Sequence, residues 1–364
     1  MIKLPGLIDT HVHLREPGAT YKEDWDTGTA AALAGGFTLV LAMPNTSPPI
    51  VDADSFRLSD ESATRKAHCD YGIYLGATRT NAAAIVPLWK EAAGLKMYLD
   101  ATYGPLLLDD MEIWARHLRF WTKGRPIVAH AERRTLAALL FLAEMYDRPV
   151  HIAHVSRKEE IWLIREAKAR GVPVTCEVTP HHLFLTKDSG SGGKFEVRPR
   201  LAFQEDVDAL WENLDIIDSF ATDHAPHTLA EKESDSPPPG FPGLETALPL
   251  FLTAVQEGRL TLDDLVEKMY TNPRKIFNLP EQVETWIEVD ETARYEIHAA
   301  EHFSKCGWTP FEGWKVQGRV TRVVLRGRDV FRDGKLLAPS GFGYNIRSWQ
   351  YEAEDEIEPA ECWL

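Results

Sequence analysis

The chain has 364 residues, of which 44% are hydrophobic and 26% charged, a composition typical of a globular protein with one large or two ordinary domains. Its formal net charge of −15 argues against nucleic acid and against an anionic membrane as partners. The four cysteines are scattered, and neither a leader segment nor a membrane-spanning apolar run is visible. We therefore expect a cytoplasmic protein without a disulfide framework.

Eight short apolar segments recur along the chain, mostly bounded by Gly or Pro, and each is expected to form a buried strand. Stretches with helical spacing of apolar residues lie between them. The expected strands are residues 6–13, 37–43, 71–76, 95–99, 126–130, 149–154, 173–178 and 216–222. The expected helices include residues 22–34, 54–66, 81–93, 109–121, 132–146 and 157–170.

Eight alternations of strand and helix predict an α/β fold, a (β/α)₈ TIM-type barrel over residues 1–280. No glycine-rich dinucleotide motif follows the first strand, which disfavours a doubly wound sheet. Residues 281–350 are expected to form a C-terminal extension with strands at 320–325 and 329–337. This small β appendage should pack with the N-terminal residues, and residues 351–364 read as an acidic tail.

Polar side chains stand at or near the ends of seven of the eight expected strands, where a barrel places its reactive groups. His11 and His13 are two residues apart, so on a strand both face the same side and can reach one ion. Imidazoles and carboxylates together suit zinc. The residues at these strand ends are His11, His13, Asn45, Lys96, His130, His154, Glu177 and Asp223.

Lys96 lies in an otherwise apolar segment, where an unpaired buried ammonium would cost several kcal/mol. One interpretation is a side chain that extends to the rim of the barrel. The other is an amine with a depressed pKa that carbon dioxide converts to a carboxylate able to bridge two metal ions.

Positively charged or polar side chains near the strand ends are candidates for binding a small anionic substrate. Arg15 follows His13 by two residues and can bind a carboxylate with two parallel hydrogen bonds. Asn45, Arg198 and His227 are the other candidates, and any single Arg could instead form a surface ion pair. His181, His182 and His224 are interpreted as supporting residues, and His181 or His182 could orient Glu177. His68, His117, His151, His298 and His302 are given no role.

Seven motifs together resemble the dihydroorotases of the amidohydrolase superfamily, in particular the dihydroorotase domain of multifunctional pyrimidine-synthesis polypeptides. The resemblance covers nearly the whole chain. The motifs are His11-Val-His-Leu-Arg-Glu-Pro-Gly18, Met43-Pro-Asn-Thr46, Gly94-Leu-Lys96, Ala129-His-Ala-Glu132, Ala153-His154, Cys176-Glu-Val-Thr-Pro-His-His182 and Thr222-Asp-His-Ala-Pro-His227.

The resemblance implies reversible cyclisation of N-carbamoyl-L-aspartate to L-dihydroorotate. It implies one zinc ion on His11, His13 and Asp223, a second on His130 and His154, and carboxylated Lys96 bridging them. Glu177 matches a position that can contact a third ion, and Asp223 would shuttle the proton. Arg15, Asn45, Arg198 and His227 would hold the substrate, while Thr102 and Tyr103 match the catalytic positions of a mobile loop that closes over it.

Two alternatives stay open from the sequence. Dihydroorotase-like domains of fungal multifunctional polypeptides are known as inactive scaffolds, so a non-catalytic domain is one. A hydantoinase or dihydropyrimidinase type of cyclic amidase is the other, although Arg15 and Asn45 favour a substrate with a carboxylate. The resemblance also implies a homodimer and neighbouring domains in a larger polypeptide.

Overall fold

The computed structural model describes residues 1–348, and the residues expected to form an acidic tail lie outside this part of the chain. Within it, ten strands lie before residue 221, of which β1 belongs to an antiparallel sheet and the other nine to parallel sheets. They are β1 (Ile2–Pro5), β2 (Leu7–Val12), β3 (Phe37–Ala42), β4 (Asp70–Ile73), β5 (Leu75–Gly76), β6 (Leu95–Tyr98), β7 (Ile127–His130), β8 (Val150–Ile152), β9 (Val174–Val178) and β10 (Ser219–Phe220).

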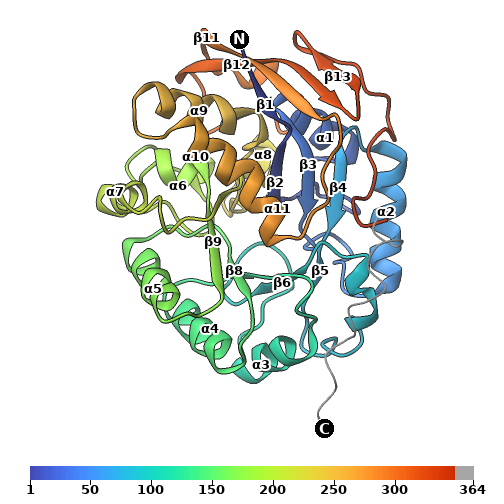
Figure 1. Ribbon diagram of the computed structural model, residues 1–364, viewed down its shortest axis with the longest axis vertical. Helices are drawn as coiled ribbons and strands as arrows, with labels where there is room; N and C mark the ends of the chain where they lie inside the picture. Colours follow the sequence, from blue (N-terminus) through green and yellow to red (C-terminus); the bar gives the residue numbers. More distant parts are fainter. Residues whose placement is uncertain (349–364) are drawn as a thin grey trace.

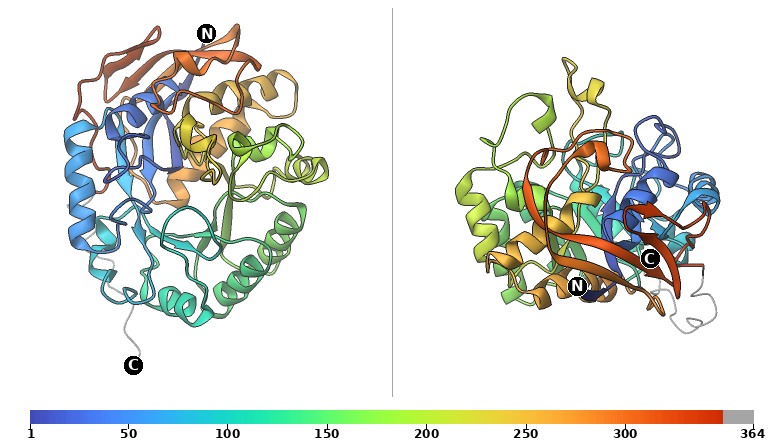
Figure 2. Two further views of the ribbon diagram at one scale, coloured as in Figure 1. Left: turned by 180° about the vertical axis from the view of Figure 1, so that it is seen from behind. Right: turned by 90° about the horizontal axis from the view of Figure 1, so that it is seen from above.

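Helices alternate with these strands and lie outside them, as Figures 1 and 2 show. The longer ones are α1 (Trp25–Ala34), α2 (Ala53–Lys66), α3 (Met111–Phe120), α4 (Arg134–Met145), α5 (Lys158–Ala169), α7 (Gln204–Glu212) and α9 (Leu244–Gln256). The shorter ones are α6 (Pro180–Phe184), α8 (Leu229–Lys232), α10 (Leu262–Val266) and α11 (Asn272–Ile276), with single turns η1 (Val86–Lys90), η2 (Gly193–Phe195), η3 (Glu267–Thr271) and η4 (Ala299–Glu301).

Strands β2 to β10 form two parallel sheets. One has the order β2-β3-β4 and the other β10-β9-β8-β7-β6-β5. Every residue of β2 and β3 is buried, because helices cover one face and the interior fills the other. All eight expected strand segments therefore contain strands, with the third interrupted at Tyr74 between β4 and β5. The predicted α/β class is confirmed.

Most of the expected helices are also present, and their starts have clear physical causes. The side chain of Asp52 accepts a hydrogen bond from the backbone N–H of Ser55 at 2.8 Å and so caps α2. After α5, Gly171 adopts a positive φ of 83°, which ends the helix before β9. Among the described residues, no helix has the length and apolar content needed to cross a membrane.

The helix expected over residues 81–93 is wrong, since only the single turn η1 forms there. The Asn81 side chain accepts from the N–H of Thr78 and donates to the carbonyls of Val51 and Gly76, which fixes a turn. Pro87 has no N–H for a helical hydrogen bond. Local side-chain bonding thus prevails over helical propensity.

The N-terminal and C-terminal segments share an antiparallel sheet with the order β1-β11-β12-β13-β14. It contains β11 (Trp286–Glu296), β12 (Lys315–Leu325), β13 (Arg328–Arg332) and β14 (Lys335–Leu336). Asp333 and Gly334 make the expected turn between the last two, both with positive φ. The sheet lies across one end of the molecule, at the top of Figure 1. The expected packing of the appendage with the N-terminal residues is confirmed by the pairing of Ile2 with Val289.

Candidate active site

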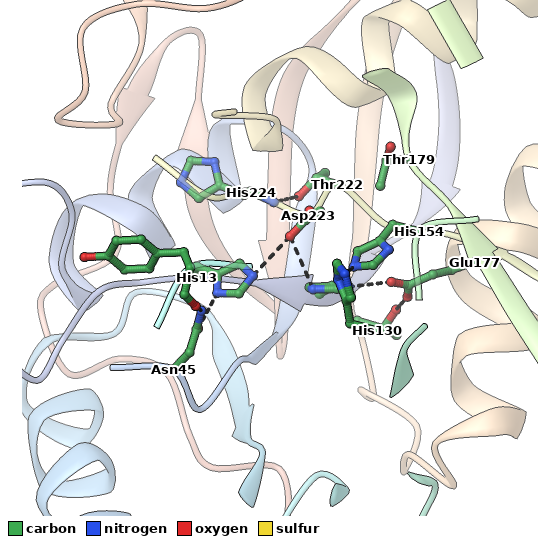
Figure 3. Close-up of polar contacts among 12 residues, drawn as sticks. His13, Asn45, His130, His154, Glu177, Thr179, Thr222, Asp223 and His224 are labelled. Atoms are coloured by element: carbon green, nitrogen blue, oxygen red, sulfur yellow. Dashed lines mark hydrogen bonds and ion pairs between the residues drawn. The ribbon is translucent and has the colours of Figure 1, made fainter. Parts of the chain in front are cut away.

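The polar residues at the strand ends converge on one buried site. Figure 3 shows His13 and Asn45 on one side of Asp223, and His130, His154 and Glu177 on the other. His11 and His130 are the last or next-to-last residues of β2 and β7, and Lys96 and Glu177 lie within β6 and β9. All of the candidate metal ligands are at least 93% buried.

His11, His13 and Asp223 offer ligand atoms that all lie within 4.8 Å of one another. The Nε2 atoms of His11 and His13 are 3.2 and 3.1 Å from Oδ1 of Asp223. Burial lowers the pKa of both imidazoles, which favours the neutral form that binds metals. Two neutral imidazoles and a carboxylate are a donor set that fits zinc.

The other nitrogen of each ring has its own acceptor, which fixes the direction of the free Nε2 lone pair. Nδ1 of His13 donates to Oδ1 of Asn45 at 2.6 Å. Nδ1 of His11 donates to Oε1 of Glu177 at 2.5 Å. Both rings are thus held with Nε2 directed at Asp223.

His130, His154 and Lys96 form the second half of the site. Nδ1 of His130 lies 3.0 Å from Nε2 of His154. Nδ1 of His154 and Nζ of Lys96 are buried and have no hydrogen-bond partner among the described residues. An amine left without a partner at 0% exposure is costly, so these atoms fit a site made for a further group.

Lys96 does not extend to solvent, because its whole side chain is buried. The Nζ atom lies 5.3 Å from the centre of the Tyr98 ring. Burial lowers the pKa of Lys96 to about 8, against the pull of the Glu177 and Asp223 carboxylates. The neutral amine is therefore much more populated near neutral pH than it would be at the ordinary lysine pKa of 10.5.

Glu177 is held by three residues, only one of which is a candidate ligand. Its carboxylate accepts from Thr10 at 3.1 Å and contacts His11, and Nε2 of His151 lies 3.2 Å away. Of the two histidines considered for this role, His182 instead bonds to Thr179 and the carbonyl of Pro199. His151, to which the sequence assigned no role, supports Glu177. Its position as the next-to-last residue of β8 was not enough to reveal this role.

Arg15 and His227 lie together at the mouth of the site. Nε of Arg15 donates to the carbonyl of Pro226 at 3.0 Å, and its Nη2 is 3.0 Å from Nε2 of His227. Burial and the neighbouring cations Arg15 and Lys22 hold the pKa of His227 far below its usual range. Arg198 lines the same cavity, although its guanidinium also pairs with Glu196.

Lys22 is a member of this group that the sequence did not single out. Its side chain is only 2% exposed. Nζ donates to Nδ1 of His227 at 3.0 Å and to the Tyr103 hydroxyl at 3.2 Å, and it pairs with Glu231 at 2.8 Å. It precedes α1 in the chain, far from any expected strand end, so no sequence signal marked it.

The loop that follows β6 covers the site. The backbone carbonyl of Tyr103 accepts from Nδ2 of Asn45 at 3.0 Å, and its ring lies 5.1 Å from the Arg15 guanidinium. Thr102 and Tyr103 both line the cavity, whose remaining volume is about 20 Å³. That space is about one water molecule, so residues that line the cavity must move before a larger molecule can enter.

Three site residues adopt a left-handed backbone that non-glycine residues seldom take. Arg15, His154 and Asp223 have φ values of 60°, 37° and 47°. Each costs about 1–3 kcal/mol unless the surroundings enforce it. Asp9, buried in β2, accepts hydrogen bonds from the backbone and hydroxyl of Thr222 and so holds the segment that carries Asp223. Burial raises the pKa of Asp9 to about 7.

Comparison with known proteins agrees with this geometry. The model of the amidohydrolase family matches residues 2–330. A dihydroorotase from Pyrococcus furiosus is 37% identical over 354 residues, covering 92% of this chain and 82% of that protein. The chain is an amidohydrolase of the dihydroorotase family. His11, His13 and Asp223 form the metal-binding group of this amidohydrolase.

Larger relatives of this amidohydrolase contain the domain as one part. The multifunctional protein CAD of Squalus acanthias is 59% identical over 352 residues. The match covers 96% of this chain but only 16% of the length of that relative. A solved structure described as the inactive dihydroorotase-like domain of a Chaetomium thermophilum CAD-like multifunctional protein has a TM-score of 0.82. It is 30% identical, and the match covers 95% of this chain and 99% of that one.

Proposed function

We propose that the chain is an active dihydroorotase that interconverts N-carbamoyl-L-aspartate and L-dihydroorotate. The observation that carries this proposal is Lys96, a fully buried amine without a hydrogen-bond partner, between a His–His–Asp group and a His–His pair. A scaffold with no chemistry to perform would gain stability from an apolar residue at this position.

The ligand set fits two zinc ions. His11, His13 and Asp223 would hold one and His130 and His154 the other, with Glu177 available to a third. The neutral Lys96 amine would add carbon dioxide and release one proton, and the resulting carbamate would provide a further carboxylate ligand for these ions. When bound, the ions supply Lewis acidity, which activates water and polarises the carbonyl that reacts.

Asp223 would hold the proton that the reaction moves. Ring opening breaks the amide bond between the ring nitrogen and carbonyl carbon, so water supplies a hydroxyl to carbon and a proton to nitrogen. Asp223 is buried beside Nε2 of His11 and His13, where its carboxylate would take up that proton and return it in the second step. Ring closure runs the same transfers in reverse.

Arg15, Asn45, Arg198 and His227 would bind the carboxylate and ring of the substrate. In the described conformation Asn45 and Arg15 contact Tyr103 instead. We infer that the loop carrying Thr102 and Tyr103 opens to admit substrate and then closes over it. Its closing would exclude water from the reacting groups.

We further infer that the two parallel sheets close into a (β/α)₈ barrel. Only Tyr74 separates β4 from β5, and the N–H of His13 donates to the carbonyl of His224 at 2.7 Å. These contacts support continuity at both junctions between the sheets. The barrel would span residues 1–280, with residues 281–350 as the appended β extension. A cytoplasmic homodimer, within a larger multifunctional polypeptide, is the proposed assembly.

The second candidate is a non-catalytic scaffold domain, which the similarity to the inactive Chaetomium thermophilum domain favours. Ring opening and ring closure should be measured on zinc-loaded protein in bicarbonate, with bound metal quantified. Asp223→Asn serves as the control and should lower kcat by about 100-fold or more. Turnover in both directions with little activity on hydantoin supports dihydroorotase. Folded protein that binds two ions but shows neither ring opening nor ring closure would overturn the proposal and favour the non-catalytic scaffold domain.

A further inference from the structure

A second and larger cavity, of about 520 Å³, opens beside the candidate active site. Its wall is formed by the start of α4, the beginning of the loop that follows β6, and the segment after η2. Two carboxylates, Asp100 and Glu132, contribute to this wall. So do five guanidinium groups, those of Arg133, Arg134, Arg157, Arg198 and Arg200.

The cavity keeps a positive formal charge in a chain whose net charge is −15. Its five arginines outnumber four carboxylates, namely Asp100 and Glu132 of the wall and Glu196 and Asp206, which pair with Arg198, Arg200 and Arg157. Among residues 1–348, no carboxylate lies within ion-pair distance of the Arg133 or Arg134 guanidinium. These two charges are therefore available to a ligand.

The two acidic side chains of the wall already have other partners. Asp100 accepts hydrogen bonds from the backbone N–H of Glu132 at 2.7 Å and from the Thr135 hydroxyl. Oε1 of Glu132 lies 3.2 Å from Nε2 of His130. Both carboxylates thus have partners within the protein, which leaves Arg133 and Arg134 as the cavity's arginines without a carboxylate partner among the described residues.

The cavity adjoins the active site. Arg198 lines both cavities, and Ala101 of the larger one immediately precedes Thr102 of the smaller. A ligand that leaves the larger cavity would therefore pass Arg198 and the covering loop. The volume is within the range of sites for small molecules.

We propose that this cavity, the arginine vestibule, binds dicarboxylate anions and delivers the open-chain substrate to the active site. The proposal rests on the proposed function for the delivery step but not for the binding step. The open-chain acid carries two carboxylates, and ring closure consumes one of them. A chain of charge −15 repels a dianion more than a monoanion, so a local positive cavity matters most for the open-chain substrate.

The test replaces three of the four arginines that lie outside the active-site cavity, as Arg133→Gln, Arg134→Gln and Arg200→Gln combined. Arg157, the fourth, pairs with Asp206 and is left in place. A matched control removes three exposed arginines elsewhere, as Arg65→Gln, Arg170→Gln and Arg332→Gln combined. Equilibrium dialysis with radiolabelled succinate, a dicarboxylate that does not react, measures binding without turnover. We expect the vestibule variant to raise the Kd for succinate about tenfold or more and the control to leave it within twofold. An unchanged Kd would overturn the vestibule even if the enzyme is active.

Delivery is tested by kinetics in both directions at low and high salt. In the vestibule variant, kcat/KM for N-carbamoyl-L-aspartate should fall about tenfold at low ionic strength, and that for dihydroorotate about threefold. Both losses should shrink with added salt, while kcat stays unchanged. Equal losses for the two substrates, or losses that salt does not reduce, would refute delivery. Absence of turnover in the unmodified protein would refute the proposed function, while succinate binding would still decide the vestibule.

Discussion

Lys22 donates a hydrogen bond of 3.2 Å to the hydroxyl of Tyr103, which ties the loop over the active site to the segment before α1. The same ammonium lies 4.8 Å from the centre of the Tyr103 ring and contacts His227. A phenylalanine at position 103 could not accept this bond. The closed position of the loop thus depends on a hydroxyl that reaches a buried cation.

Lys22→Met should release the loop. One hydrogen bond to a charged group contributes about 1.5–3 kcal/mol, so the open form should become at least about tenfold more populated. Chymotrypsin cleavage after Tyr103 measures this population, since the cleaved sequence is the same in both proteins. Tyr103→Phe, which keeps a cleavable aromatic residue, should show a similar increase. Equal cleavage rates in all three proteins would show that Lys22 does not hold the loop.

Lys96→Ala should reduce bound zinc from two ions per chain to one or none, because the proposed shared ligand is lost. The substitution also leaves a cavity, which destabilises the fold. This loss should be small, because the substitution removes a buried amine that has no hydrogen-bond partner among the described residues. Metal analysis after gel filtration, with circular dichroism on the same sample, separates the two effects. Retention of two ions by folded Lys96→Ala protein would contradict the bridging role.

Glu177→Gln should weaken zinc binding by about 10–100-fold without abolishing it. The carboxylate orients His11 through a 2.5 Å contact, and an amide can still accept that hydrogen bond but provides no charge. Competition with a metal chelator gives the affinity. His151→Phe, which removes a supporting contact of Glu177 while keeping a ring of similar size, should produce a smaller loss. A larger loss of zinc affinity in His151→Phe than in Glu177→Gln would contradict the assignment of His151 as only a supporting contact of Glu177.

Glu245 should make the protein less stable as the pH rises through the neutral range. Burial raises the pKa of this carboxyl, at the start of α9, to about 8. A carboxyl whose pKa is higher in the folded state stabilises the fold fully below its unfolded pKa of about 4.3, and this contribution is lost as the pH rises toward 8. The unfolding free energy should therefore drop by about 2 kcal/mol between pH 6 and pH 8.

Urea denaturation at the two pH values measures that drop. Glu245→Gln removes the titrating group and leaves a side chain of the same shape in contact with the N–H of Phe303. The pH dependence of this variant should be flatter by about the same 2 kcal/mol. Identical pH profiles for the two proteins would show that Glu245 does not bind its proton in the folded state.

The sequence could predict site residues that are marked by their place within a single strand, either by its two-residue period or by its end. His11 and His13 share a face because of the two-residue period, and His130 lies at the end of an apolar run. Lys22, His151 and Asp9 could not be predicted, because each acts through partners more than 25 residues away. Asp9 contacts Thr222, and Lys22 contacts Tyr103 and His227.

Errors in the secondary structure have a similar origin. Residues 81–93 have helical composition, but the contacts of Asn81 with Val51 and Gly76 decide their conformation. Strand β11 was not anticipated, since its outer half is largely exposed and only Ile287 and Val289 are fully buried. Short-range patterns carry little information where a segment is stabilised by distant parts of the chain.

The pairing of β1 with β11 has a consequence for synthesis on the ribosome. Ile2 can pair in this sheet only after Val289 has been synthesised. Strand β1 lies directly before β2, the strand that carries His11, and only Gly6 separates the two. The segment before β2 therefore has no pairing partner in the antiparallel sheet until about four-fifths of these residues, up to Val289, have been translated. Such long-range contacts form slowly, and a nascent chain stalled before β11 would expose this edge to other unfinished chains.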